Sequence, residues 1–241
     1  IENAEEAVYE EKKMEEMEVC FLMDRFGYMK LIDKNAYERN KEAVHNENKY
    51  VFNCMNTDKI CIFTDTGKMH TIKAVDIPLG RFRDKGTPVD NLSNYDSSQE
   101  RMLYVAPVGQ LRSDRLLFVT KTSMCKLVEG AEFDVAKRTI ASTKLADEDE
   151  LIFIGSASEM EQIVLQSHGG CFLRFLTQEV STMKKTALGV RGMKLADDDY
   201  LEHAYLLAGH QEYTISYHDK EYALNKVRLA KRDTKGIKPR I

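Results

Sequence analysis

Apolar residues in this chain gather in short runs, and each run ends at a residue typical of turns. The runs are rich in β-branched and aromatic side chains, which favour strands. Glycine ends three of them, and a tight hairpin turn favours glycine because it needs a positive φ. The pattern therefore predicts five β-hairpins, which are built on residues 19–27, 60–67, 116–123, 163–170 and 213–220.

The hairpins repeat along the chain. Their turn positions follow one another at intervals of 40, 56, 47 and 50 residues. A second landmark, Lys-Leu-Ala-Asp followed by more acidic residues, begins at Lys144 and again at Lys194, 50 residues apart. Self-similarity at such a period is the signature of a propeller-like or stacked architecture. Residues 163–201 carry the best-preserved copy of the repeat.

Each repeat reads as a hairpin, a basic loop and a second hairpin around the acidic turn. Five such units predict an all-β fold, a five-bladed propeller-like ring of four-stranded blades over residues 17–241. No helical periodicity is visible after the N-terminal tail. Residues 1–16 are rich in glutamate and in helix formers, so a helical or frayed connector is expected there.

Composition narrows the class of protein. The chain has 241 residues, of which 43% are hydrophobic, and its apolar runs are far shorter than the roughly 18 residues that a membrane span needs. The acidic N-terminus does not resemble a signal peptide, and a cytoplasmic protein is expected. The five cysteines are scattered without a CxxC pair, which predicts reduced thiols in the core.

Charge is unevenly distributed. The formal net charge is −4, but residues 1–18 hold eight Glu and only two Lys. Residues 220–241 hold eight Lys or Arg and only two acidic residues. The acidic excess therefore belongs to the N-terminal tail, and the net charge does not exclude a polyanionic partner for the repeats.

The candidate catalytic and metal-binding patterns are incomplete. The acidic turns at 147–150 and 197–199 lack the alternating ligands and central glycine of a calcium loop, so solvated turns are expected. Ser167 and His168 are adjacent on a strand and would point to opposite faces, which favours a hairpin turn over a nucleophile. We expect no catalytic residue, metal or cofactor in this domain.

Basic loops recur at similar places in the units, at residues 80–86, 183–192 and 226–236. One basic loop is ordinary surface, but equivalent loops would form a positive stripe around the rim. Such a stripe suits the phosphates of double-stranded DNA, contacted without regard to sequence. The predicted contact residues are Lys30, Arg81, Arg83, Lys85, Arg174, Lys184, Lys185, Arg191, Lys226, Arg228, Lys231, Arg232 and Lys235.

Several segments resemble the C-terminal domain of bacterial type IIA topoisomerase A subunits. They are the hairpins at 26–30, 66–70 and 169–175 and the segments IPLGRFRDKGTPVDNL (77–92) and TALGVRGMKLADDD (186–199). The resemblance covers residues 17–241. It implies a β-pinwheel, whose blades exchange strands, that binds and bends DNA around its basic edge. It also implies a strand-cleaving domain upstream, a partner B subunit with ATPase activity, and a place on the bacterial nucleoid.

One departure from that family bears on the type of enzyme. Gyrase A subunits carry the box Q-R-R-G-G-K-G after the first hairpin, where this chain has Glu38-Arg-Asn-Lys-Glu-Ala-Val44. Its absence favours a topoisomerase IV A subunit, which relaxes and decatenates DNA. The alternatives are a gyrase domain with a degenerate box and a propeller-like protein-interaction module. An enzyme with a site in a central channel is disfavoured, because no convergent polar cluster recurs.

Overall fold

The computed structural model describes residues 14–241, so the tail predicted over residues 1–16 lies mostly outside the described residues. Antiparallel sheets dominate the fold, and all five predicted hairpins are present. In chain order these are β1 (Glu18–Met23) with β2 (Tyr28–Ile32), β4 (Lys59–Thr64) with β5 (Lys68–Lys73), β8 (Arg115–Thr120) with β9 (Met124–Glu129), β12 (Gln162–Ser167) with β13 (Phe172–Leu176), and β16 (Thr214–Tyr217) with β17 (Lys220–Ala223).

The first four hairpins gain a third strand from their own unit, and the first three also gain a fourth from the next unit. The third strands, each paired with the first strand of its hairpin, are β3 (Tyr50–Met55), β7 (Met102–Pro107), β11 (Leu151–Ser156) and β15 (Leu201–Leu207). The exchanged strands are β6 (Thr87–Pro88), β10 (Thr139–Ala141) and β14 (Val190–Arg191), which pair with β2, β5 and β9. In the fourth sheet, an isolated antiparallel β-bridge between Ile237 and Phe172 stands beside β13, where the first three sheets have their exchanged strand.

The prediction of a second hairpin in each unit is wrong. The strands on either side of the acidic turn 197–199 are β14 and β15, and they belong to two different sheets. Sequence order suggested a hairpin because the strands are close along the chain. They separate because β14 leaves its own unit to complete the preceding sheet, and β15 then returns.

Short helices connect the strands. The α-helices are α1 (Lys34–Arg39), α2 (Lys41–Glu47), α3 (Val89–Leu92) and α4 (Val108–Leu111), and the 3₁₀ helices are η1 (Ala74–Asp76), η2 (Gly130–Phe133), η3 (Thr177–Glu179) and η4 (Leu224–Lys226). Helices α1 and α2 correct the expectation of no helix beyond the tail. They occupy the part of the first unit where the next three units send a strand to the preceding sheet and the fifth makes a single bridge to it. No described helix has the length and apolar character needed to cross a bilayer.

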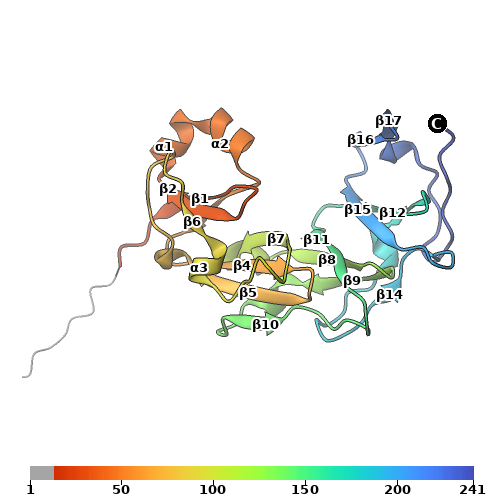
Figure 1. Ribbon diagram of the computed structural model, residues 1–241, viewed down its shortest axis with the longest axis horizontal. Helices are drawn as coiled ribbons and strands as arrows, with labels where there is room; N and C mark the ends of the chain where they lie inside the picture. The colour runs from red at the N-terminus through yellow and green to blue at the C-terminus, as the bar shows by residue number, and fades with distance from the viewer. Residues whose placement is uncertain (1–13) are drawn as a thin grey trace, which may run out of the picture.

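The sheets follow one another along an arc (Figure 1). The first sheet and the fifth hairpin lie at its two ends, apart from each other, so an arc stands where a ring was predicted. Within residues 14–241 the first three sheets have four strands, the fourth has three and the fifth has two. Neighbouring third strands (β3 with β7, β7 with β11, β11 with β15) contact one another and form the inner side of the arc.

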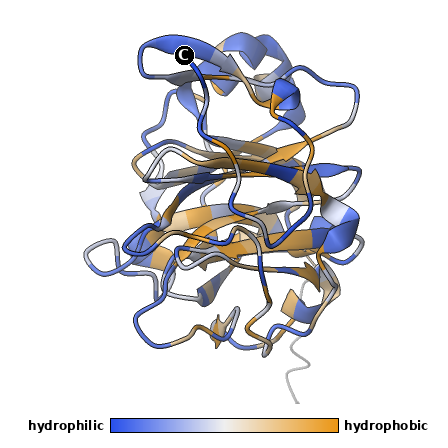
Figure 2. Ribbon diagram, turned by 90° about the vertical axis from the view of Figure 1, so that its right-hand side faces the viewer, coloured by the Kyte–Doolittle hydropathy of each residue, from blue (hydrophilic) through white to orange (hydrophobic). Residues whose placement is uncertain are grey.

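Most sheets are buried on both faces, which explains the continuous apolar runs. In β4, Ile60 and Ile62 pack toward the first sheet, whereas Cys61 and Phe63 pack toward the third. Successive side chains of a strand point to opposite faces, so a strand between two cores needs apolar residues at every position. Hydrophobic residues accordingly concentrate on the stacked sheets and hydrophilic ones on the loops (Figure 2). All five cysteines are free thiols, and four are buried, as predicted.

The acidic turns fasten the hairpin turns. Asp149 Oδ1 accepts a hydrogen bond from the Thr122 N–H (3.1 Å), and Asp199 Oδ1 accepts one from the Gly169 N–H (2.8 Å). Burial acts to raise the pKa of the Asp199 carboxyl, but the hydrogen bonds that it accepts and the nearby His168 outweigh burial and lower it. The third acidic residue of each turn, Asp149 or Asp199, therefore fastens the hairpin turn of its own unit.

Three of the four segments that cross to the preceding sheet, all but the one that leads to β10, need glycine where they join that sheet. Gly86, Gly189 and Gly236 have φ values of +87°, +107° and +72°. A Cβ at these positions would lie 2.4, 2.5 and 2.7 Å from the carbonyl oxygens of Met29, Cys125 and Phe172. Both the dihedral angle and the close backbone approach exclude other residues at low energy.

We predict that Gly86→Ala lowers the free energy of unfolding by about 2–4 kcal/mol, because it combines a positive φ with a backbone clash. Gly80→Ala is the matched control in the same loop. Gly80 has no positive φ, and its Cβ would meet only the carboxylate of Asp84, so a loss below about 1 kcal/mol is expected. Urea unfolding followed by circular dichroism measures both. Equal losses would contradict the role of Gly86.

We predict that Asp199→Ala lowers the free energy of unfolding by about 1–2 kcal/mol at pH 7, whereas Asp197→Ala, exposed in the same turn, has little effect. The folded pKa of Asp199 is below its ordinary value. Its contribution is therefore present above the unfolded pKa and is lost as pH falls through the lower folded value. Stability of the Asp199→Ala protein should depend less on pH in the acid range, and an unchanged pH dependence would refute the assignment.

Candidate nucleic-acid interface

Four loops at equivalent places carry the chain from one sheet back to the preceding one. We call residues 80–86, 133–139, 183–189 and 230–236 the crossover loops. Three of them begin with the same backbone bond, donated by the N–H of Gly80, Met183 and Ala230 to the carbonyls of Leu31, Leu127 and Arg174 (2.9, 2.7 and 2.8 Å). The fourth, 133–139, is aligned by strand register, because Ile140 pairs with Met69 as Thr87 pairs with Met29.

The crossover loops lie on the outer side of the arc. The first three lead into a strand at the edge of the preceding sheet opposite its third strand, and the fourth leads to the bridge at Ile237 beside β13. The third strands form the inner side. Figure 1 shows β10 and β14 on the outside and β7 and β11 within. The strand exchange therefore puts the loops of successive units along one rim, as the predicted stripe requires.

Every crossover loop carries a surplus of basic residues. Loops 80–86 and 230–236 each hold three Lys or Arg and one Asp, loop 183–189 holds two Lys and no acid, and loop 133–139 holds Lys137 and Arg138 with Asp134. Basic groups at equivalent positions in successive units form a row along the rim.

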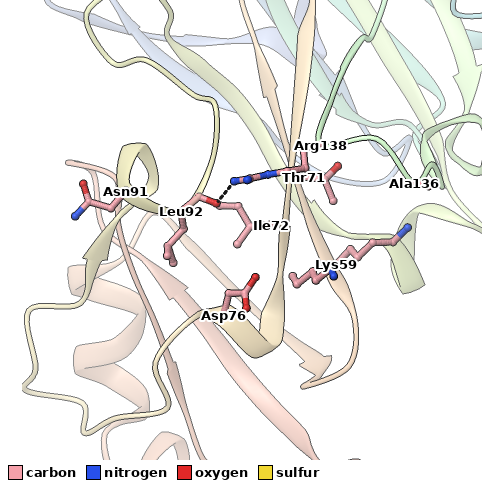
Figure 3. Close-up of a pocket in the computed structure, with 9 residues that line it drawn as sticks. Lys59, Thr71, Ile72, Asp76, Asn91, Leu92, Ala136 and Arg138 are labelled. Carbon is pink, nitrogen blue, oxygen red and sulfur yellow. Dashed lines mark hydrogen bonds between the residues drawn. The ribbon is translucent and has the colours of Figure 1, made fainter.

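Hydrogen bonds join successive crossover segments. Arg138 in the second loop donates to the carbonyl of Leu92, which follows the first loop, at 3.1 Å (Figure 3). The Lys144 N–H donates to the Lys185 carbonyl (3.1 Å), and Arg232 donates to the carbonyl of Arg191 (2.7 Å). The pocket of Figure 3 lies between the first two segments and is also lined by Lys59 and Lys73.

The thirteen predicted contact residues fall into three groups. Two are exposed but ion-paired, Arg81 with Asp84 and Arg191 with Asp233. A hydrogen bond from the Arg191 guanidinium lowers the pKa of Asp233, and hydrogen bonds from Arg81 lower that of Asp84. Seven are exposed, and their side chains make no hydrogen bond or ion pair within residues 14–241: Arg83, Lys85, Lys184, Lys226, Arg228, Lys231 and Lys235.

The remaining four point into the protein and hold backbone carbonyls. Lys30 donates to the carbonyls of Phe82 and Asp84, and Arg174 to that of Val227 (2.6 Å). Likewise Lys185 donates to the carbonyl of Glu132 (3.2 Å) and Arg232 to that of Glu179 (3.0 Å). Lys30 supports loop 80–86 from inside, and the other three bond segments outside the crossover loops. The contact of these four cations with DNA stays a prediction.

Sequence reasoning missed three basic residues of this rim. Lys137 and Arg138 were overlooked because their loop does not end in glycine. The Lys-Leu-Ala-Asp landmark locates them, since loop 133–139 ends five residues before Lys144 as loop 183–189 ends five before Lys194. Lys126 was also missed, although it stands three residues after its turn residue Ser123, as Lys30 stands three after Gly27.

Comparison with known proteins gives the family. The family model described as the DNA gyrase C-terminal domain, beta-propeller, matches residues 58–97, 114–158 and 161–208, more than half of the chain. Among curated proteins, the DNA gyrase A subunit of Ureaplasma parvum is 25% identical over 236 residues, which cover 91% of this chain and 28% of that protein. The DNA gyrase A subunit of Salmonella typhimurium is 31% identical over 144 residues, 59% of this chain and 16% of that protein.

Solved structures agree on the fold. The C-terminal domain of DNA topoisomerase IV superposes with a TM-score of 0.81 at 22% identity, covering 93% of this chain and 73% of that one. A DNA gyrase A C-terminal domain gives a TM-score of 0.61 at 18% identity, covering 92% and 76%. The chain spans less than a third of the length of the gyrase subunits that it matches. From its matching family model, its strand-exchanged sheets and its fold, the chain belongs to the family of DNA gyrase C-terminal domains with a β-propeller fold.

Proposed function

We propose that this domain binds double-stranded DNA along the crossover loops and bends it around the outer side of the arc. The observation that carries the proposal is the recurrence of exposed, unpaired cations on loops that the strand exchange places at equivalent positions. A Lys or Arg side chain in solvent neutralises a phosphate without reading a base. Duplex DNA that follows a curved row of such charges is bent, at an elastic cost that the added contacts offset.

The short crossover loops are suited to contact phosphates and not to read bases. Reading bases requires an element that enters a groove and places several side chains on base edges. The crossover loops instead return to the sheet within seven residues, and their exposed cations stand singly on long side chains. The domain should therefore bind DNA of any sequence with similar affinity.

We further propose that the full protein is a topoisomerase IV-like A subunit, which relaxes and decatenates DNA. Residues 38–44, where a gyrase box would stand, lie in α1 and α2 in place of a glycine-rich basic loop. Val44 is fully buried against the first sheet, so this segment is committed to packing. A gyrase domain with a degenerate box is the alternative. A plasmid assay of the full enzyme, in which negative supercoiling would favour the alternative, separates the two.

The partners follow from the same proposal. In the full protein the domain would present DNA to a strand-cleaving domain of the same chain, and an ATPase B subunit would supply the energy of the cycle. The catalytic residues would then belong to those parts. A bacterial cell would hold this enzyme in the cytoplasm, on the nucleoid.

A protein-interaction module would need a large exposed apolar surface. Exposed apolar side chains do meet at one place in the described residues, where Met14, Met17, Val75 and Leu79 line a groove near the start of the domain. This groove is small and lies beside the first described residues, whereas the basic row extends over four crossover loops. DNA binding is therefore preferred over docking of another protein.

A salt titration of duplex binding tests the function. The logarithm of the binding constant should fall linearly with the logarithm of salt concentration, by about 0.9 for each phosphate neutralised. The triple variant Lys184→Gln, Lys231→Gln, Lys235→Gln should bind duplexes of different sequence more weakly by a similar factor. It should also reduce the slope by about 0.9 for each phosphate that is no longer neutralised.

Lys49→Gln is the matched control, because Lys49 is also exposed but precedes β3 on the inner side of the arc. It should change neither affinity nor slope. Absence of duplex binding at low salt would refute the proposal. A control that weakens binding as much as the triple variant would refute the assignment of DNA to the outer rim.

A further inference from the structure

Lys126 is a buried lysine beneath the third crossover loop. Its side chain is among the largest fully buried ones, with 1% of the residue exposed. Its Nζ donates to the carbonyls of Ala187 (2.6 Å), Lys185 (2.9 Å) and Lys184 (3.4 Å), which all belong to loop 183–189. The ring of Phe118 lies on the paired strand, with its centroid 5.6 Å from Nζ. The ammonium is thus satisfied by the loop above it.

The same arrangement occurs under the first crossover loop. Lys30 has the strand position of Lys126, since Leu22 pairs with Lys30 as Phe118 pairs with Lys126. Its Nζ donates to the carbonyls of Phe82 and Asp84, the third and fifth residues of loop 80–86. Lys185 and Ala187 are the third and fifth residues of loop 183–189. Each of these two loops, which differ in sequence, is therefore bonded from inside by a lysine at the same strand position.

A buried ammonium group is unfavourable unless its hydrogen-bonding capacity is met. No carboxylate of the described residues forms a salt bridge with Lys126, and the three carbonyls supply the compensation. Burial lowers the pKa of Lys126 to about 8, and the carboxylate of Glu132 acts in the opposite direction. The other charged side chains at this place are Lys185, which donates to Glu132, and Lys144, whose N–H bonds the Lys185 carbonyl.

The bonds to Lys126 set the shape of the loop. Three of its carbonyls bond one buried ammonium group, while the side chain of Lys184 is exposed. Because the loop separates this ammonium from solvent, Lys126 cannot touch a phosphate. Its charge nevertheless lies directly below the residues that are proposed to bind one.

We propose that Lys126 is a positioning residue for DNA, whose buried ammonium holds loop 183–189 in the shape that presents Lys184 to a phosphate. The inference rests on the proposed function of the rim. It goes beyond that function by assigning DNA affinity to a residue that DNA does not contact. It also implies that affinity depends on the charge state of this buried group.

The dependence on pH has a definite sign. A bound polyanion stabilises the charged form of Lys126, so the pKa of Lys126 is higher in the complex than in the free domain. By linkage, DNA affinity is constant at pH values below the pKa of Lys126 in the free domain, which is about 8. It falls as pH rises from there toward the pKa of Lys126 in the complex. The pH profile of the Lys126→Met protein separates this fall from any pH dependence that other groups contribute.

The test compares Lys126→Met with Lys184→Gln in duplex binding at fixed salt from about pH 7 to 9.5, a range that spans the pKa of Lys126. Lys126→Met should weaken binding about tenfold at pH 7, because the loop loses its charged donor, and it should lose the fall in affinity above pH 8. Lys184→Gln should keep that fall. In the double variant the two losses should be less than additive, since Lys126 acts through the position of Lys184.

Wild-type affinity for Lys126→Met, or fully additive losses, would overturn the inference while leaving DNA binding by the rim intact. Absence of wild-type binding at pH 7 and low salt would instead refute the proposed function. If Lys126→Met does not fold, Glu132→Gln replaces it. Removing this carboxylate should move the fall in affinity to lower pH, and an unmoved midpoint would overturn the inference.

Discussion

The structure depends on one constraint, which is that no unit completes its own sheet. A hairpin with its third strand still has an open edge, and unpaired backbone groups at that edge are satisfied when the next unit sends a strand back to it. The crossover loop that carries this strand must leave one sheet, reach the rim of the preceding one and turn sharply into its edge. Gly86, Gly189 and Gly236 make that turn possible at a place where a Cβ would strike a backbone carbonyl.

The basic residues of the rim therefore serve two purposes. A loop that runs outside the sheets leaves carbonyls without strand partners, and Lys30 and Lys126 supply donors to them from within. Cations such as Lys184 and Lys231 remain in solvent, where a phosphate can reach them. A count of Lys and Arg in these loops overstates the charge that DNA can contact directly, because part of it is used to shape the loops.

The candidate site was only partly predictable for the same reason. Exposed and internal cations have the same residue types and are neighbours along short loops, so sequence cannot separate Lys184 from Lys185. Lys126 illustrates the limit, since a lysine within an apolar strand is read as a surface position until its partners across the fold are known. Helices α1 and α2 were not predicted because each is shorter than two turns and carries only one buried residue.

What the sequence by itself determined is the local structure: five hairpins, their turns and a repeat of about fifty residues. These follow from side-chain pattern and turn chemistry over a few neighbouring residues. Only the tertiary structure decided which sheet each later strand joins, that the acidic turns fasten hairpin turns, and that the sheets form an arc. Those features depend on pairing and close approach between residues far apart in the chain, such as Ser123 and Met193 at a separation of 70 positions, and no local pattern encodes them.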